Sequence, residues 1–200
     1  MQTIGEPLLR NDQIEANYAR YKELLHPHVT PEFFSWLDAS DFKESPASTK
    51  YHSSWKGGLC EHSLGTLKYL WKFVTLTPER DYSPETIVRV ALLHDICKAD
   101  TYSLAPRNRK IDGQWQTIME FEFNQHMPFG HGAKSVIIAQ QHGVNLSTDE
   151  ILAIYHHMGA YGLDYLQLQE YSAATQQCPL VYHLHVADHY EALLHGYRKP

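Results

Sequence analysis

The sequence predicts an all-α protein: a compact helical bundle with one small β-hairpin inserted around residues 101–123. Three observations support this fold class. Apolar side chains recur at helical spacing along most of the chain, capping residues and prolines mark the starts of those stretches, and only one segment alternates apolar and polar residues. Because no internal repeat, low-complexity tract or linker divides the chain, we expect a single domain over residues 1–200, with N-terminal helices within 1–45 packed on a core at 55–195.

The predicted helices are recognised by an apolar face together with a cap or a proline in the first turn. In chain order they cover 11–25, a short stretch opened by Thr30-Pro31, about 59–76, a stretch opened by Ser83-Pro84, 132–141, a stretch from the capping box of Ser147 and Glu150 to about Met158, and a last helix opened by Pro179. In the hairpin, Asp112-Gly113 is a common two-residue turn between strands. Spacing alone predicts no element for 159–178.

Composition excludes several classes of protein. The chain has 17 Lys and Arg against 23 Asp and Glu, a formal net charge of −6, which disfavours strong binding to double-stranded nucleic acid because such binding needs a basic surface. The apolar runs are too short to cross a bilayer, and no secretory signal is visible, so we expect no membrane association. The three cysteines, Cys60, Cys97 and Cys178, are odd in number and far apart, which fits a cytoplasmic protein.

Histidine is the unusual component of this sequence. There are 14 histidines, spread from His26 to His195 instead of gathered in a tag, and histidine is the commonest protein ligand for transition metals. The candidate ligands near helix ends or inner helix faces are His62, His94, Asp95, His131, His156, His157 and Asp188. Taken singly, each has an ordinary structural explanation. We expect six other histidines to be packed residues that are hydrogen-bonded to carbonyls: His26, His28, His52, His142, His185 and His195.

In this order the candidates resemble the motif series of the HD-domain superfamily of metal-dependent phosphohydrolases. The series comprises His62, LLHDICK at 92–98, His131, HHMG at 156–159 and VAD at 186–188. The stretch KGGLCEHSL resembles HD proteins related to bacterial 3′–5′ exoribonucleases, and the insert ending in PFGHGAKS resembles that of small bacterial and phage HD hydrolases. The resemblance implies an HD-domain helical bundle. The run HHMGAYGLDY lacks the Gly-Tyr-Pro signature of the HD-GYP branch, so hydrolysis of cyclic-di-GMP by that branch is not expected.

The resemblance also implies a metal centre. Its ligands for a first metal are, by position, His62, His94, Asp95 and Asp188. Asp95 would bridge to a second metal held by His131 and one of His156 and His157; His157 is favoured because it directly precedes Met158-Gly159, and His156 is the alternative. Mixed imidazole and carboxylate ligands suit one or two divalent ions of iron, manganese, zinc, nickel or cobalt, and magnesium is also possible.

The activity implied by the resemblance is hydrolysis of a phosphoester, in a nucleotide or short nucleic acid, by a metal-activated hydroxide. Asp95 and Lys98 would be the catalytic residues, because Lys98 matches the lysine of the family's H-D-x-x-K variant and would neutralise a phosphate oxygen. A solvated lysine at a helix C-terminus is the other explanation. The candidate substrate-binding cations are Lys98, Arg107, Arg109 and Lys134, and the expected partner is a small phosphorylated molecule, a nucleotide.

Two alternatives to hydrolysis stay open. Some di-iron HD relatives activate dioxygen with the same types of ligand, and a nucleotide-sensing HD domain could keep its metals without turnover. Lys98 and the basic hairpin favour hydrolysis over oxidation. The presence of a suitable residue at each of the six ligand positions argues against an inactive sensing domain.

Overall fold

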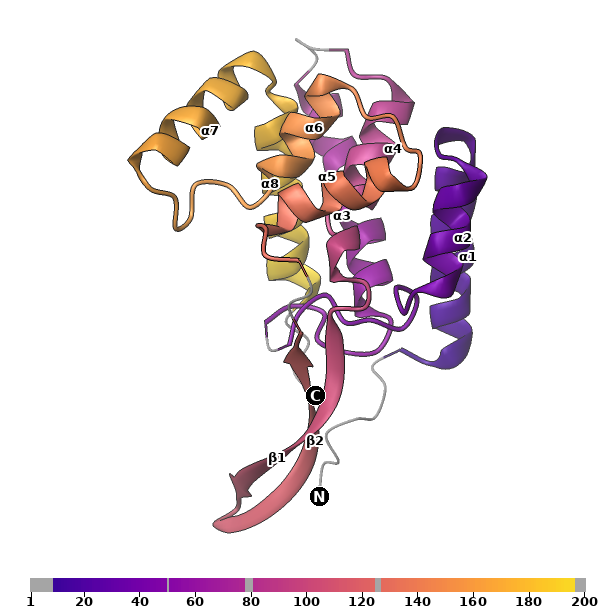
Figure 1. Cartoon of the computed structure of the whole chain (residues 1–200), viewed down its shortest axis with the longest axis vertical. Coiled ribbons are helices and arrows are strands. Elements are labelled where there is room, and N and C mark those ends of the chain that lie inside the picture. Colours follow the sequence, from indigo (N-terminus) through magenta and orange to yellow (C-terminus); the bar gives the residue numbers. More distant parts are fainter. Residues whose placement is uncertain (1–8, 50, 78–80, 125–126, 197–200) are drawn as a thin grey trace.

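The computed structural model describes residues 9–49, 51–77, 81–124 and 127–196, and side chains up to 194. Helices form a bundle from which a two-stranded hairpin projects, as Figure 1 shows, and the predicted fold class is confirmed. The elements are α1 (Asn11–Leu25), α2 (Pro31–Ala39), α3 (Gly58–Leu76), α4 (Pro84–Leu93), β1 (Tyr102–Ile111), β2 (Gln114–Phe123), α5 (His131–Gln141), α6 (Thr148–Tyr155), α7 (Tyr165–Gln177) and α8 (Leu180–Glu191). Within the described ranges, no helix is both long and apolar enough to cross a bilayer.

The bundle is organised around α3, which packs along α8 and against α4, while α6 packs on α5 and α8. One cluster of buried apolar side chains draws members from each of the helices α1 to α8. On the N-terminal side, the fully buried Tyr21 of α1 donates a 2.6 Å hydrogen bond from its hydroxyl to the carbonyl of Leu92 in α4. This bond gives the buried Tyr21 hydroxyl a partner, without which its burial would be costly. It also connects α1 to α4, the helix that precedes the His94-Asp95 pair.

The predicted caps are present. The side chains of Thr30, Ser83 and Ser147 each accept a hydrogen bond from a backbone N–H three residues later, and Ser147 forms its capping box with Glu150. The predicted end of α6 at about Met158 is wrong, because the helix ends at Tyr155. The chain then turns through Gly159 at φ +70°, a conformation that favours glycine.

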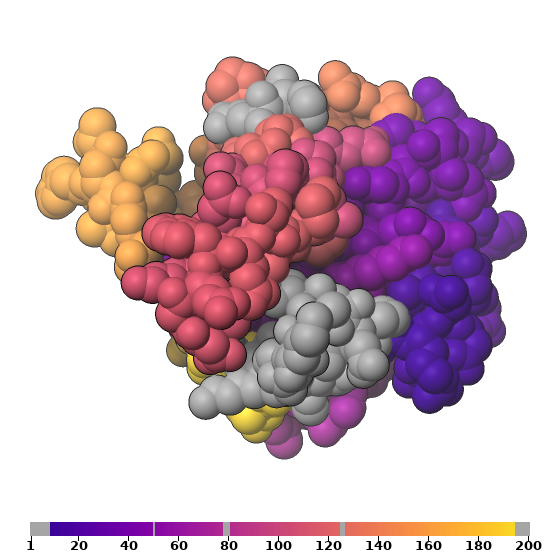
Figure 2. Space-filling model, turned by 90° about the horizontal axis from the view of Figure 1, so that it is seen from below, coloured from indigo at the N-terminus to yellow at the C-terminus, as the bar shows by residue number. Residues whose placement is uncertain are grey.

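The hairpin follows the predicted turn. Asp112 and Gly113 have φ of +50° and +83°, as the two central residues of a type I′ turn require, and Ile111 pairs with Gln114 beside it. The strands are largely exposed, and Trp115 is 73% exposed. Seen from its own end in Figure 2, the hairpin stands out from the helical body toward the viewer.

Helix α7 is the element that the sequence did not predict. Asp164 caps it and forms a capping box with Gln167, but Ala174 is its only buried residue. Its apolar side chains, including Leu166 and Leu168, are exposed. The helix therefore has no apolar face that spacing could reveal, and it projects from the side of the bundle in Figures 1 and 2.

Candidate metal centre

His62 lies in α3 directly after a tight entry to that helix. Gly57 has φ +79°, and a Cβ on Gly58 would lie 2.1 Å from the carbonyl oxygen of Ser53. The glycine pair therefore lets the loop before α3 close over the start of the helix. His62, in the second turn, is fully buried in the interior of the bundle.

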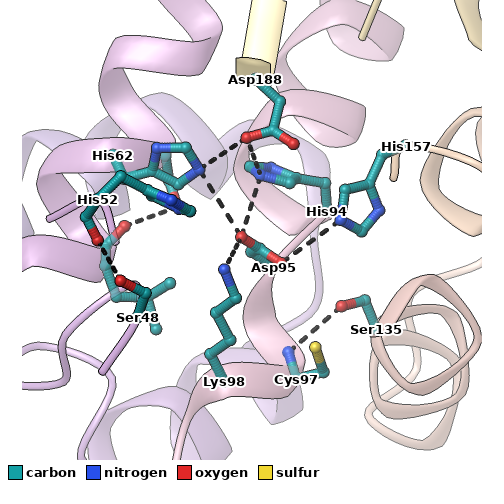
Figure 3. A network of polar contacts seen from close by, with 12 residues as sticks. Ser48, His52, His62, His94, Asp95, Cys97, Lys98, Ser135, His157 and Asp188 are labelled. Atoms are coloured by element: carbon teal, nitrogen blue, oxygen red, sulfur yellow. Dashed lines mark hydrogen bonds and ion pairs between the residues drawn. The ribbon is translucent and has the colours of Figure 1, made fainter. Parts of the chain in front are cut away.

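The His94-Asp95 pair lies where α4 ends. Two adjacent residues of a regular helix point about 100° apart. Here Asp95 leaves the helical conformation, with φ −117° and ψ 15°, and begins the short 3₁₀ turn Ile96–Lys98. This irregular turn brings the Asp95 carboxylate to 3.4 Å from Nε2 of His94, so both side chains face the same point, as Figure 3 shows.

The Asp95 carboxylate occupies the middle of the cluster. Its Oδ2 lies 3.7 Å from Nε2 of His62 and 3.4 Å from Nε2 of His94, whereas its Oδ1 lies 3.5 Å from Nε2 of His157. All four side chains are buried. The two oxygens of one carboxylate thus face two different sets of histidines, which is the arrangement that a bridging ligand needs.

Asp188 of α8 completes one side of the cluster. Its Oδ1 lies 3.0 Å from Nε2 of His62 and 3.9 Å from Nε2 of His94. The side chain of Asp188 is 15% exposed, whereas those of His62, His94 and Asp95 are at most 2% exposed. Asp188 is therefore the most exposed of these four side chains.

The hydrogen bonds of the three buried histidines test whether the cluster suits a metal. Nδ1 of His94 donates to the carbonyl of Ala91 at 2.8 Å, and Nδ1 of His157 donates to that of Ile154 at 2.7 Å. Nδ1 of His62 donates to the carboxylate of Glu191. Each ring is therefore fixed with Nε2 turned into the cluster, as outer hydrogen bonds fix metal-ligating histidines.

These inward-facing atoms lack hydrogen-bond partners. Among the described side chains, the buried polar atoms with no partner include Nε2 of His62, His94 and His157 and Oδ1 of Asp95. Buried polar atoms without partners are costly, and their convergence indicates that the site is built to hold something. Imidazole and carboxylate donors suit a divalent transition metal, so the residues fit the metal that the sequence predicts.

The charges of the cluster keep its carboxylates ionised. Burial alone would raise the pKa of Asp95, but Lys98, whose Nζ lies 2.6 Å from Oδ2, and His94 hold it well below its usual range. Burial likewise opposes the charged form of Asp188, yet its contacts with His62 lower its pKa. Burial also disfavours protonation of His62, but Asp188 and Glu191 outweigh it and raise the His62 pKa to about 10. The negative charges of Asp188 and Glu191, which favour the protonated form of His62, also favour a bound metal cation.

A second group of donors lies on the other side of Asp95. A carboxylate oxygen of Asp95, the sulfur of Cys97 and a ring nitrogen of His131 all lie within 4.8 Å of one another. His131 is the first residue of α5, and its Nδ1 is buried without a partner. A Cβ on Gly132 would lie 2.2 Å from the carbonyl oxygen of Tyr155, so glycine lets the start of α5 approach the end of α6, next to His157.

Some predicted site residues lie elsewhere. The ring of His156 packs against those of Tyr155 and Tyr171, at centroid distances of 4.7 and 5.8 Å, and His156 belongs to none of the donor groups found in the described chain. The geometry thus favours His157 over His156. Lys134 is buried with Nζ 5.5 Å from the centroid of the Phe123 ring, and its charge acts to lower the pKa values of Cys97 and His131.

The hairpin arginines do not join the cluster. Arg107 and Arg109 form exposed ion pairs across the hairpin with Glu122 and Glu120, at 2.9 and 2.7 Å. At about 3.3 Å per residue, they lie roughly 17–23 Å along the strand from its base at Tyr102. Their role in substrate binding stays a prediction.

Sequence reasoning missed three residues of the site: Cys97 as a donor, Glu191 and His52. Glu191 stands three residues after Asp188 on one helix, and this spacing is the signal that could have identified it. The ring of His52, which we expected to be an ordinary packed residue, lies 4.8 Å from that of His62, with Nε2 unpartnered. Burial and the nearby positive groups His62 and Lys98 lower the His52 pKa to about 3. The side chain of His195 lies outside the described part of the chain.

Comparison with known proteins agrees with this arrangement. The family model of the HD domain matches residues 59–193, which include every residue of the three donor groups in the described chain. The chain belongs to the HD-domain family. The resemblance predicted from the ordered motifs is thereby confirmed.

One curated relative of this HD domain is the dihydroneopterin 2′,3′-cyclic phosphate phosphodiesterase of Methanocaldococcus jannaschii. The two are 31% identical over 119 residues, which cover 56% of this chain and 41% of that protein. The HD-domain chain therefore matches less than half the length of this relative. No solved structure matches the chain.

Substitution of Glu191 tests whether its carboxylate orients the His62 ring in the HD-domain site. Because its carboxylate fixes the His62 ring with Nε2 inward, we expect Glu191→Gln to weaken metal binding by about 10–100-fold, the usual effect of losing such an outer hydrogen bond. Titration of metal-stripped protein against a chelator of known affinity measures this. Gly65→Ala should also weaken metal binding. The new Cβ would lie 2.5 Å from Cγ of Glu191 and would displace the carboxylate that holds His62. The exposed Glu170→Gln is the control, and equal affinities in all three variants would contradict the assignment.

Proposed function

We propose that the chain is a metal-dependent phosphohydrolase that cleaves a phosphodiester in a small, nucleotide-like molecule. The observation that carries the proposal is the position of Asp95, whose two oxygens face His62 and His94 on one side and His157 on the other. Two divalent ions held in this way supply Lewis-acid stabilisation of phosphoryl oxygens and activation of water. In this proposal His62, His94, Asp95 and Asp188 hold the first ion, and Asp95, His131 and His157 hold the second.

Lys98 is the proposed partner of the phosphate. It is buried, and its ammonium lies 2.6 Å from Oδ2 of Asp95, beside the point where the cluster converges. Burial alone would lower the pKa of Lys98, but the Asp95 charge raises it, so the side chain stays protonated at neutral pH. A fixed positive charge in a water-poor site stabilises the negative charge that develops on the phosphoryl oxygens.

The proposed substrate class is a phosphodiester with a small organic group. The name of the archaeal relative specifies a 2′,3′-cyclic phosphate attached to a ring system, which supports a diester substrate for this chain. The exposed edge of the cluster at Asp188 is where such a molecule would enter.

The experiment is a phosphoester panel. Purified protein is stripped of metal, reloaded separately with Fe²⁺, Mn²⁺, Co²⁺ and Zn²⁺, and offered bis-p-nitrophenyl phosphate, nucleoside 2′,3′-cyclic phosphates, nucleoside 3′,5′-cyclic phosphates and p-nitrophenyl phosphate. We expect cleavage of diesters by at least one metal form, no cleavage by the stripped protein, and slower cleavage of the monoester. If no metal form releases product from any ester, the proposal fails. Oxygen uptake with a carbon substrate would then identify the oxidative alternative.

A further inference from the structure

Cys97 lies in the 3₁₀ turn that carries Asp95. It is the second residue after Asp95, and it is 4% exposed. Its backbone N–H donates a 3.3 Å hydrogen bond to the hydroxyl of Ser135 in α5. Ser135 is four residues after His131, so the two lie on the same side of α5. Figure 3 shows Cys97 beneath Asp95 and facing Ser135. The turn and α5 thus hold the Cys97 sulfur near Asp95 and His131.

The donor distances suit a common ligand sphere. The sulfur of Cys97, an oxygen of Asp95 and a ring nitrogen of His131 lie within 4.8 Å of one another. Tetrahedral bonds of about 2.0–2.3 Å place one sulfur and two oxygen or nitrogen donors roughly 3.3–3.5 Å apart, so the separations between these donors need to shrink by about 1.5 Å at most. His157 contacts the Asp95 member of this group, since its Nε2 lies 3.5 Å from Oδ1 of Asp95, and it also lies in a donor group with Asp95 and His94.

Unpartnered atoms give independent support to this group. Oδ1 of Asp95 and Nε2 of His157 belong to side chains that are at most 2% exposed; the two atoms lie 3.5 Å from each other, and neither forms a hydrogen bond of normal geometry in the described structure. Nδ1 of His131 is buried without a partner as well. These atoms indicate a ligand on the side of Asp95 that faces Cys97.

We propose that the thiolate of Cys97 is a ligand of the second metal ion, together with Asp95, His131 and His157. The inference rests on the proposed metal centre and makes its two positions chemically different. On coordination the S–H bond of Cys97 breaks, its proton passes to solvent, and a metal–sulfur bond forms without any change in oxidation state. A thiolate ligand favours Zn²⁺, Co²⁺ and Fe²⁺ over Mg²⁺ and Mn²⁺ at this position.

The other cysteines provide matched controls. Cys60 is also buried, and it packs in the apolar core two residues before His62. The Cys178 sulfur lies 3.8 Å from the carbonyl oxygen of Asp149. Neither belongs to a donor group in the described structure. Substitution of Cys60 therefore removes a thiol of similar burial that lies outside the proposed ligand sphere.

The test is a cobalt titration of the metal-stripped full chain, followed by absorption spectroscopy. Bound Co²⁺ gives visible ligand-field bands whichever donors hold it, whereas a thiolate-to-cobalt charge-transfer band in the near ultraviolet requires a coordinated sulfur. We expect the near-ultraviolet band to saturate with one of two bound ions. Cys97→Ala should abolish that band and weaken the binding of one ion by more than about 100-fold, the upper range for loss of an outer partner. Cys60→Ala should leave both properties unchanged.

The outcomes separate this inference from the proposed function. If cobalt binds with visible bands but the wild-type protein shows no near-ultraviolet band, or if the band survives in Cys97→Ala, Cys97 is not a ligand, and the phosphoester panel still decides the activity. If no cobalt binds, both proposals fail. X-ray absorption of the zinc-loaded wild-type protein checks the result without any substitution, because a sulfur neighbour at about 2.3 Å is expected and its absence would overturn the inference.

Discussion

Asp95→Asn is expected to reduce kcat for phosphodiester hydrolysis at least about a thousandfold, which corresponds to ~4 kcal/mol in the activation barrier. Asparagine has nearly the same size, but it carries no charge and offers only one oxygen. It can therefore face His62 and His94 with that oxygen, or His157, but not both. We expect the variant to bind at most one metal ion per chain. Hydrolysis of bis-p-nitrophenyl phosphate and elemental analysis of the reloaded protein measure the two effects.

Asp164→Asn is the matched control for this substitution. Asp164 caps α7 at the surface, and asparagine is an equally good helix cap, so the same chemical change should leave activity and metal content intact. An Asp95→Asn protein that binds two ions and hydrolyses the diester at more than a tenth of the wild-type rate would contradict the bridging role of Asp95.

Lys98→Met is expected to lower kcat by about 100–1000-fold while the protein still binds its metals. Methionine keeps much of the length and apolar volume of the lysine side chain but removes the charge beside Asp95. This loss of kcat is the usual effect of removing one fixed group that stabilises charge in the transition state. Because Lys98 acts on developing charge, kcat should fall more than KM rises. Steady-state kinetics with the metal-loaded variant measures this difference.

Lys68→Met on the exposed face of α3 serves as the control, with unchanged kinetics expected. If Lys98→Met lost its metal ions together with its activity, the lysine would act by holding the Asp95 turn in place, and its assignment to the phosphate would be wrong. An unchanged kcat in a metal-loaded Lys98→Met protein would also contradict that assignment.

Much of the fold is predictable from the sequence because its signals are local. The observed bounds of α1 and α3 match the predicted ranges within one residue, since apolar faces and helix-stopping residues lie close together in the chain. The hairpin turn is set by Asp112-Gly113 alone. Helix α7 was missed because its only buried residue is Ala174, and the end of α6 was misplaced because no glycine or proline marks the turn at His156.

The candidate site is predictable only in part. The ordered motifs identified the residues that converge on Asp95, because each motif carries its own local pattern. The partners that orient them depend on the folded chain: the hydrogen bond from His62 to Glu191 joins residues 129 positions apart. Arg107 pairs with Glu122 diagonally across the two strands, a contact between residues 15 positions apart, so composition alone indicated a basic hairpin where the structure has ion pairs.

The most direct test of the account is the metal content and position in untreated protein. An anomalous-scattering map from crystals of protein purified without chelator should show two peaks per chain. One peak is expected between His62, His94 and Asp188, the other beside His131 and His157, with Asp95 in contact with both. A map without a peak at Asp95, supported by elemental analysis that finds less than one ion per chain, would contradict the proposed metal centre and the hydrolytic function built on it.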